Sequence, residues 1–222
     1  MDGNGRWAKK RLLPRIAGHS QGLQSAQNIV RLSINNKIKY LTLFTFSTEN
    51  WERPDEEVKG LLKLIDESVS KASDQIFNNN IAINFLGDIS AFPKNLQKQL
   101  INLEKKCAKN NGLVLNIALN YGGRAEILRA VNKLINLNHK KVIEKDIEKN
   151  LDTAGMPNVD LLIRTGGEKR ISNFLLWQIA YAELFFIDTL WPDFSEKHFI
   201  QALDWYQKRQ RKFGGLMDNS HA

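Results

Sequence analysis

Apolar residues along the chain follow two patterns that alternate from segment to segment. Between Val58 and Ile76 they return every three or four residues, which is the period of one face of an α-helix. Pro54 stands where such a helix would begin, and the run Asn78–Asn80 is predicted to end it. The same period predicts further helices over about Gln21–Asn35, Leu96–Cys107, Ala125–Ile135 and Phe199–Tyr206.

Short, continuous apolar runs separate these helices, and polar or glycine-rich residues bound each run. Such runs predict buried strands at Tyr40–Ser47, Ile81–Gly87, Leu113–Tyr121 and Val159–Gly167. Strands that alternate with helices of this length favour an α/β fold, with a mostly parallel central sheet flanked by helices. The chain of 222 residues has no internal repeat, low-complexity tract or linker, so a single domain over residues 1–222 is expected.

The apolar composition supports a core but no membrane span. Hydrophobic residues make up 42% of the chain. The longest apolar stretch, Phe174–Ile187, is interrupted by Gln178 and Glu183, so it is predicted to be buried core. Cys107 is the single cysteine and has no internal disulfide partner, and no signal peptide is expected before the fold. These features predict a cytoplasmic protein.

The chain is basic, with a formal net charge of +8 and a pI near 9.5, which points to an anionic partner. Nucleic acid, an anionic membrane surface and a phosphorylated substrate all have this chemistry. A nucleic-acid binder would carry its basic residues along one helix, or aromatic side chains on a sheet face. Here the arginines stand in glycine-rich turns after predicted strands, which favours the phosphorylated substrate.

Polar segments that contain arginine follow three of the predicted strands, at Ser47–Pro54, Asn120–Arg124 and Arg164–Asn173. Ligands of open α/β sheets bind beyond the carboxyl ends of the strands, which is where these segments lie. In the third segment, Arg164 and Arg170 flank a Gly-Gly pair and Ser172 follows, a set of donors that suits a diphosphate. The alternative is a turn closed by a salt bridge to Glu168.

The opening segment Asp2–Arg6 contains two glycines and could bind a second anion through its backbone N–H groups, with Arg15 and His19 shortly downstream. The alternative is a frayed terminus. A carboxylate such as Asp2 repels a diphosphate unless a cation lies between them, and Mg²⁺ takes one or two carboxylates together with phosphate oxygens. Glu183 also needs a partner if it is buried, and that partner is either functional or a structural arginine.

Five segments occur in order across nearly the whole chain: MDGNGRWA, GHSQG, FTFSTENWERP, NYGGR and DLLIRTGGEKRISNFLLWQIAYAELFF. Together they resemble the cis-prenyltransferase family. The resemblance implies an Mg²⁺-dependent transferase that adds isopentenyl diphosphate units to farnesyl diphosphate, giving undecaprenyl diphosphate for the cell-wall lipid carrier. It also implies a homodimer, transient contact with the inner face of a membrane, and no nucleic-acid partner.

The resemblance assigns roles to residues of this chain. Catalytic roles fall to Asp2, which would bind Mg²⁺, to Asn50 and to His19. Glu183 matches a second acid of the metal or substrate site. Substrate contacts are implied for three groups. The allylic-diphosphate group is Gly3, Asn4, Gly5, Arg6, Arg15 and His19; the orienting group is Ser47, Asn50, Trp51 and Arg53; and the isopentenyl-diphosphate group is Arg164, Arg170 and Ser172. Trp7, Thr48 and Glu49 are further implied substrate contacts.

The apolar stripe of the Val58–Ile76 helix has two interpretations, because it could pack in the core or form the wall of a cavity. The family resemblance favours a wall, since Leu61, Leu64 and Leu115 fall where the family has an apolar tunnel for its product. The sequence does not fix the length of that product. A synthase of different product length and a non-catalytic partner subunit therefore stay open as alternatives.

The chain departs from the family pattern at three places. The family has a short apolar strand before MDGNGRWA, so either residues before Met1 supply it or the sheet lacks this strand. We expect about ten or more mostly apolar residues before Met1, as a central strand of the sheet. Lys169 stands where some members carry a histidine, a candidate metal ligand. Lys212 stands where many carry arginine, which keeps the charge but loses the guanidinium fork.

Overall fold

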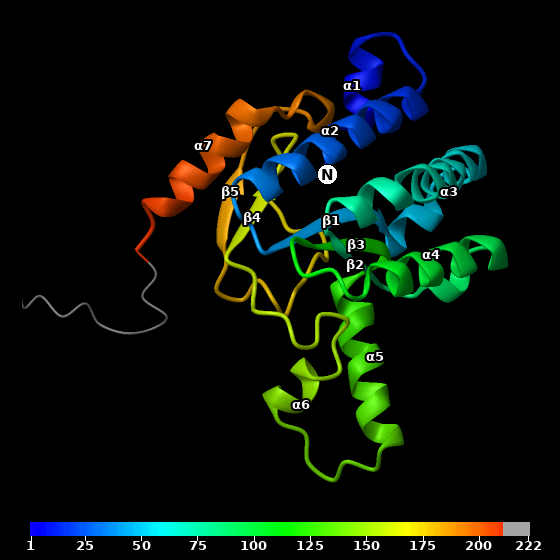
Figure 1. The fold of residues 1–222 in the computed structure, drawn as a ribbon, viewed down its shortest axis with the longest axis vertical. Coiled ribbons are helices and arrows are strands. Elements are labelled where there is room, and N and C mark those ends of the chain that lie inside the picture. Colours follow the sequence, from blue (N-terminus) through cyan, green and yellow to red (C-terminus); the bar gives the residue numbers. More distant parts are fainter. Residues whose placement is uncertain (211–222) are drawn as a thin grey trace, which may run out of the picture.

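The computed structural model describes residues 1–210, except for the side chains of residues 72–75 and 77. Helices and strands alternate along this part of the chain (Figure 1). The helices are α1 (Asn4–Lys10), α2 (Arg15–Asn35), α3 (Asp55–Asn78), α4 (Lys94–Cys107), α5 (Gly123–Asn136), α6 (Glu144–Glu148) and α7 (Glu196–Gln207). The strands are β1 (Tyr40–Ser47), β2 (Ala82–Leu86), β3 (Val114–Tyr121), β4 (Leu161–Arg164) and β5 (Glu183–Phe186). Short 3₁₀ turns are η1 (Thr48–Glu52), η2 (Ile89–Ala91) and η3 (Trp191–Asp193).

The strands form two parallel sheets. β3 lies between β1 and β2 in a three-stranded sheet, and β4 pairs with β5 in a separate two-stranded sheet. Every pair is parallel, with Tyr40 opposite Val114 in one sheet and Leu161 opposite Glu183 in the other. In Figure 1, α2 and α3 lie along one side of the β1-β3-β2 sheet, and α5 extends away from it. The expected α/β fold with a parallel sheet flanked by helices is therefore confirmed.

The predicted periods correspond to real buried faces. α3 begins just after Pro54, and its residues Val58 and Leu61 belong to one buried cluster with Phe46 and Leu100. β3 is buried at nearly every position, because it lies between two other strands and has cover on both faces. Side chains of a strand point to opposite faces in turn, so a continuous apolar run is expected where both faces are covered.

The opening segment differs from the flexible turn that its composition predicts. The backbone turns at Gly3, where φ is 109°, and then continues as α1. Close packing on α2 stabilises this short helix. A Cβ at Gly18 would lie 2.0 Å from the carbonyl oxygen of Asn4, so only glycine allows the two helices to approach this closely.

Two further elements were not predicted as such. The apolar run Phe174–Ile187 was predicted to be buried core, but only part of it is. Its last part forms the strand β5, and the side chains of Tyr181 and Leu184 are exposed. The short helix α6 has no apolar stripe long enough to predict it from sequence. Cys107 is buried and free, as expected for the chain's single cysteine.

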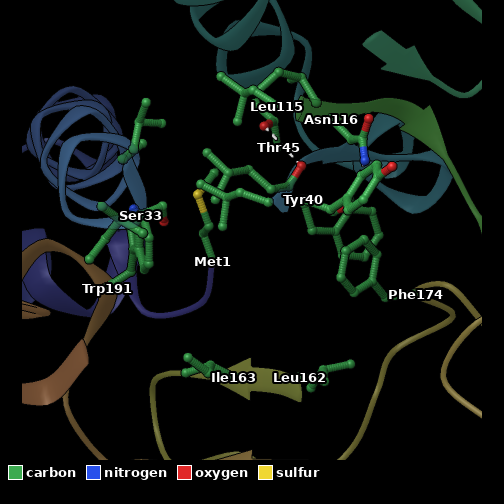
Figure 2. A pocket seen from close by; sticks show the side chains of 18 of the residues that line it. Met1, Ser33, Tyr40, Thr45, Leu115, Asn116, Leu162, Ile163, Phe174 and Trp191 are labelled. Carbon is green, nitrogen blue, oxygen red and sulfur yellow. Dashed lines mark hydrogen bonds between the residues drawn. The ribbon is translucent and has the colours of Figure 1, made fainter. Parts of the chain in front are cut away.

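A gap separates the two sheets between β1 and β4. Among the described residues each of these strands pairs on one side only, so each has unpaired backbone groups on its other side. Figure 2 shows Leu162 and Ile163 of β4 across an open space from Leu115 and Thr45, with Met1 beside that space. The expected strand before Met1 would fit between the two edges and stays a prediction.

We expect a chain extended upstream of Met1, by the residues that its genomic reading frame encodes, to be more stable than the 222-residue chain. A strand between β1 and β4 would bury apolar side chains at ~1.5–3 kcal/mol each. Two such side chains would raise Tm by on the order of 10 °C. Thermal melts of both chains measure the difference, and equal Tm values would show that no strand enters the gap.

Candidate functional site

A cavity of about 1240 Å³ opens between the helices and the two sheets. Its wall comes from α2, β1, α3 and β3 on one side, and from β4 and residues 171–179 on the other. The wall is mostly apolar and includes Leu61, Leu64 and Leu115, the residues predicted to line a tunnel. Leu115 is visible at this wall in Figure 2. The apolar stripe of α3 therefore contributes to the core and to the cavity.

Asp2 lies in the cavity wall and is anchored to the end of β4. Its backbone N–H donates to Thr165 Oγ1 at 3.1 Å, and its carbonyl oxygen accepts from Thr165 Oγ1 at 2.9 Å and from the N–H of Trp191 at 3.0 Å. Its carboxylate pairs with Arg164 Nη2 at 3.0 Å and with Arg6 Nη2 at 3.2 Å. Burial opposes ionisation of Asp2, but the two guanidiniums outweigh burial and hold its pKa below the ordinary value.

Arg164 is the centre of the donor set predicted after β4. Besides Asp2, its guanidinium donates to Ser172 Oγ at 2.8 Å and to the carbonyl oxygen of Arg170. The salt-bridged turn considered as an alternative is also present, because Arg170 Nη1 pairs with Glu168 Oε2 at 2.5 Å. That pair is largely exposed, so it contributes little to stability and is available for exchange with an anionic ligand.

A second basic cluster surrounds Glu57, in the first turn of α3. Its carboxylate pairs with Arg53 Nη1 at 2.9 Å, with Arg15 Nε at 3.1 Å and with His19 Nε2 at 3.7 Å. Arg15 begins α2 and Arg53 lies two residues before α3, so the N-terminal ends of two long helices meet at this cluster. Burial, helped by the charges of Arg53 and Arg15 and opposed by Glu57, lowers the pKa of His19, which is therefore neutral at pH 7.

The segment after β1 is fixed by its own hydrogen bonds. Ser47 and Asn50 form a capping box over η1, in which the Ser47 N–H donates to Asn50 Oδ1 at 3.0 Å. Glu49 Oε1 accepts from Asn173 Nδ2 at 2.9 Å, which joins this segment to the arginine-rich turn after β4. Trp51 packs against the core with its ring near Phe46, so it supports the cavity wall from behind.

The predicted site residues divide by whether they reach the cavity wall. Those in the wall are Asp2, Asn4, His19, Ser47, Asn50, Arg53, Arg164, Arg170 and Ser172. Those outside it are Gly3, Gly5, Arg6, Trp7, Arg15, Thr48, Glu49, Trp51 and Glu183. Arg6 and Arg15 still belong to the site, because their guanidiniums pair with Asp2 and Glu57.

Trp7 does not fit its predicted role as a substrate contact. Its Nε1 donates to Asp193 Oδ1 at 2.7 Å, and the guanidinium of Arg11 lies over its ring at 4.1 Å. These contacts hold the indole on the outer side of α1, away from the cavity. Helical geometry explains the difference, because neighbouring residues of a helix face different directions and Arg6 already faces the site.

Within one chain, Glu183 lies too far from Asp2 for the two carboxylates to form one metal site. Glu183 begins β5 opposite Leu161, whereas Asp2 contacts Arg164 at the other end of β4. Three strand residues at about 3.3 Å each separate the two ends by roughly 10 Å. Within residues 1–210, no three His, Cys, Asp or Glu side chains gather as a metal site. Lys169 is exposed, and Lys212 lies outside the described residues.

Sequence reasoning missed two residues of the site, Glu57 and Thr165. Glu57 stands four residues after Arg53, and that i, i+4 spacing across the start of a predicted helix was a usable signal. Thr165 anchors Asp2 across 163 residues of sequence, and no local pattern reveals a contact of that kind.

The fold and the site define a class of protein. Several guanidiniums gather at one end of a large, mostly apolar cavity that lies at the carboxyl ends of parallel strands. Guanidinium forks match diphosphate oxygens, and an apolar wall suits a hydrocarbon. The combination is that of an enzyme acting on a diphosphate with a hydrocarbon chain, which is a prenyltransferase.

Comparison with known proteins identifies the same class. The family model described as "Putative undecaprenyl diphosphate synthase" matches residues 1–214. The isoprenyl transferase of Aquifex pyrophilus is 49% identical over 218 residues, which are 98% of this chain and 94% of that protein. A protein of Buchnera aphidicola subsp. Schizaphis graminum, named ditrans,polycis-undecaprenyl-diphosphate synthase ((2E,6E)-farnesyl-diphosphate specific), is 46% identical over 222 residues, covering 97% of this chain and 88% of that protein.

Solved structures agree. A probable undecaprenyl diphosphate synthase from Campylobacter jejuni superposes with a TM-score of 0.81 at 35% identity, covering 88% of this chain and 92% of that one. Lavandulyl diphosphate synthase from Lavandula x intermedia, in complex with dimethylallyl diphosphate, gives a TM-score of 0.92 at 32% identity, covering 96% and 95%. The chain therefore belongs to the undecaprenyl diphosphate synthase family of prenyltransferases, and it is a transferase.

Proposed function

We propose that this chain condenses isopentenyl diphosphate with farnesyl diphosphate and extends the product to undecaprenyl diphosphate. The observation that carries this proposal is the pair of basic clusters, around Asp2 and around Glu57, beside one large apolar cavity. Two clusters match a reaction between two diphosphates. Farnesyl diphosphate is the substrate named for the Buchnera relative, which supports it as the allylic substrate.

Each cluster is proposed to hold one diphosphate. Arg164, Arg170 and Ser172 hold isopentenyl diphosphate, because the bonds of Arg164 to Ser172 Oγ and to the carbonyl oxygen of Arg170 bring the three residues together after β4. Arg15 and Arg53 hold the allylic diphosphate, together with the opening turn Gly3–Gly5. A diphosphate at either cluster would exchange with the carboxylates that now pair with these guanidiniums, because phosphate oxygens accept the same fork with more charge.

Asp2 is the proposed ligand of Mg²⁺. A single protein carboxylate fits this cation, because Mg²⁺ keeps several waters and takes its remaining ligands from substrate phosphates. Arg6 and Arg164 neutralise Asp2 in the absence of substrate, and their transfer to a diphosphate would release the carboxylate toward the cation. When bound, Mg²⁺ neutralises charge on the departing diphosphate.

The reaction needs charge stabilisation more than a protein base. The carbon–oxygen bond of the allylic diphosphate breaks, and the diphosphate leaves with the electron pair. The double bond of isopentenyl diphosphate attacks the allylic carbon, the new carbon–carbon bond forms, and a proton passes from the isopentenyl fragment to a diphosphate oxygen. Arg15 and Arg53 would stabilise the charge that develops on the leaving group.

The apolar cavity is proposed to hold the growing chain. Each added isoprene unit buries about five carbons, worth about 4 kcal/mol at ~0.8 kcal/mol per CH₂. Elongation is therefore favoured while apolar wall remains uncovered, including Leu61 and Leu64 of α3. It stops when the next unit has no apolar surface to bury, so wall residues set the product length.

A homodimer is proposed from the apolar surface on α5 and the residues that follow it. Leu128, Ile135, Leu137, Val142 and Ile143 are all exposed there. Several exposed apolar side chains within one short stretch of the chain support a protein interface there. A second copy of the chain is the occupant that the family resemblance implies.

Transient membrane contact is proposed for the corner between α1 and α2. Leu12 is almost fully exposed and Leu13 lies beside it, directly after the cations Lys9, Lys10 and Arg11. Basic residues next to exposed apolar side chains suit an anionic membrane surface. No helix in the described part of the chain is both long and apolar enough to cross a membrane. A cytoplasmic location with product release at the membrane follows as part of this proposal.

The proposal is tested by transfer activity and its dependence on Mg²⁺. We expect labelled isopentenyl diphosphate to become extractable into organic solvent when the protein is incubated with farnesyl diphosphate and Mg²⁺. Removal of Mg²⁺ by a chelator should abolish the transfer, and renewed Mg²⁺ should restore it. A lack of transfer with the cation present would favour the alternative of a non-catalytic partner subunit.

A further inference from the structure

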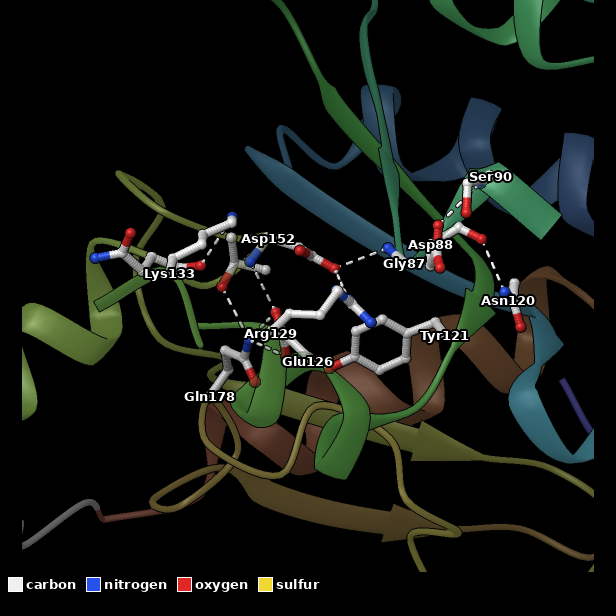
Figure 3. Close-up of polar contacts among 12 residues, drawn as sticks. Gly87, Asp88, Ser90, Asn120, Tyr121, Glu126, Arg129, Lys133, Asp152 and Gln178 are labelled. Atoms are coloured by element: carbon white, nitrogen blue, oxygen red, sulfur yellow. Dashed lines mark hydrogen bonds and ion pairs between the residues drawn. The ribbon is translucent and has the colours of Figure 1, made fainter. Parts of the chain in front are cut away.

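Glu126 is a buried carboxylate outside the cavity wall, and the proposed reaction gives it no role. It lies in the first turn of α5 and is 1% exposed. Its Oε2 accepts from Tyr121 Oη at 2.5 Å, and its Oε1 accepts from the N–H of Asp152 at 3.0 Å. Gln178 Nε2 lies 3.1 Å from both carboxylate oxygens (Figure 3). A charged group at this depth requires such partners.

All partners of Glu126 are donors: a phenol, a side-chain amide and a backbone N–H. An ionised carboxylate offers only acceptors, so the site is built for it. Burial raises the pKa of Glu126, while the hydrogen bonds from Tyr121 and Gln178 oppose the rise. Glutamine at this position would turn an N–H₂ group toward at least one of these donors.

Glu126 connects segments that are distant in sequence. Gln178 belongs to the cavity wall, and its Nε2 also donates to Thr153 Oγ1 at 2.9 Å. Asp152, whose N–H reaches Glu126, accepts from the N–H of Gly87 at 2.8 Å through its own carboxylate. The end of β2, the start of α5 and residues 171–179 are thereby held together, as Figure 3 shows.

The backbone just before Gln178 follows an unusual path. The backbone is left-handed at three residues, with φ values of 48° at Ser172, 61° at Asn173 and 45° at Leu175. Residues other than glycine rarely adopt this conformation. Each such residue costs on the order of 1–3 kcal/mol and persists only where its surroundings fix it. The left-handed path therefore depends on contacts from other elements.

Hydrogen bonds at two places, Asn173 and Gln178, tie this path to the start of α5. The carbonyl oxygen of Asn173 accepts from the N–H of Gly123 at 2.7 Å, and Asn173 Oδ1 accepts from the N–H of Arg124 at 2.9 Å. At Gln178, the side-chain amide donates to the carboxylate of Glu126. Asn173 lies within the left-handed stretch, and Gln178 follows its end.

The path decides where two donors of the isopentenyl diphosphate cluster lie. Ser172 is itself one of the left-handed residues, and its Oγ accepts from Arg164 Nη1. We infer that Glu126 is a positioning residue for this cluster, acting through Gln178 to hold Ser172 and Arg170 beside Arg164. The inference rests on the proposed function, because it assigns Glu126 to the subsite for one of its two substrates.

Kinetics of Glu126→Gln test the inference. We expect KM for isopentenyl diphosphate to rise about 5- to 20-fold, because Ser172 and Arg170 lose their fixed place, while KM for farnesyl diphosphate stays within about twofold. Glu104→Gln is the matched control. Its carboxylate accepts from the N–H of Phe85 at 2.7 Å and its pKa is also raised by burial, but it lies on α4. This control should lower Tm and leave both KM values unchanged.

A second variant and a swap keep the test decisive. Gln178→Met removes the donor but leaves Glu126 with Tyr121 and Asp152, so it should fold and show the same selective rise in KM. The double variant Glu126→Gln with Gln178→Glu restores a donor–acceptor pair, and Thr153 can turn its hydroxyl to donate. It should recover part of the lost affinity, which a general loss of packing would not.

Folded Glu126→Gln and Gln178→Met proteins with an unchanged KM for isopentenyl diphosphate would overturn the inference, as would an equal rise in both KM values. Calorimetric binding of isopentenyl diphosphate alone separates this outcome from failure of the proposed function. Weaker binding to Glu126→Gln than to Glu104→Gln supports the positioning role even without turnover. Equal binding to both overturns it.

Discussion

Asp2→Ala should lower turnover by roughly 10³-fold or more and leave the protein folded. A group that acts on developing charge is worth about 10²–10³ in kcat, and loss of the proposed Mg²⁺ ligand adds to that cost. The fold should survive because Asp2 is anchored by its main chain, through Thr165 and Trp191, and these bonds do not need the carboxylate. Steady-state kinetics and a thermal melt of the variant measure both effects.

Asp193→Ala is the control for this prediction. Asp193 also has a carboxylate beside α1, but it pairs with Arg11 and Trp7 on the outer surface. It should keep turnover within about twofold, because exposed pairs contribute little. Asp2→Asn, which keeps the shape and removes the charge, should behave as Asp2→Ala does. Near-normal turnover of a folded Asp2→Ala protein would contradict the role given to Asp2.

The two basic clusters should separate by substrate. Arg164→Ala and Arg170→Ala are expected to raise KM for isopentenyl diphosphate, and Arg15→Ala is expected to act on the allylic diphosphate. Loss of one charge-assisted hydrogen bond costs roughly 1.5–3 kcal/mol, so effects of about 10- to 150-fold are expected. The reason is spatial: Arg164 donates to Ser172 and to the carbonyl oxygen of Arg170, whereas Arg15 pairs with Glu57.

Arg209→Ala provides the reference for loss of a guanidinium elsewhere. Arg209 follows α7, and its guanidinium stacks on the ring of Trp205. The Arg209→Ala variant should leave both KM values near those of the unmodified protein. KM is measured for each substrate with the other at saturation. If all three site variants weakened both substrates equally, the assignment of one diphosphate to each cluster would be wrong.

The elements that sequence predicted well are those whose signal is local. The stripe on α3 and the continuous run in β3 reflect which faces are buried, and each can be seen within one segment. α1 could not be predicted in this way, because its stability comes from packing on Gly18 and Gly22 of a different helix. Glycine-rich sequence normally indicates a turn, and tertiary contact overrode that preference.

The same difference between local signals and contacts from distant segments applies to the site residues. Arg164, Arg170 and Ser172 lie within one turn, so their spacing alone indicated an anion site, and the structure brings them together. Glu57 is part of the site only because α2 packs so that Arg15 and His19 contact its carboxylate. The position of Glu183 depends on strand register, which the acid's place in an apolar run does not fix.

Product length is the most direct test of the central claim, that two diphosphates react beside a cavity which receives a growing hydrocarbon. The measurement is mass analysis of the product formed from farnesyl diphosphate, excess isopentenyl diphosphate and Mg²⁺. We predict undecaprenyl diphosphate as the main product, with shorter polyprenyl diphosphates as intermediates. A product that stops after one addition, as a short-chain synthase would give, would contradict the account.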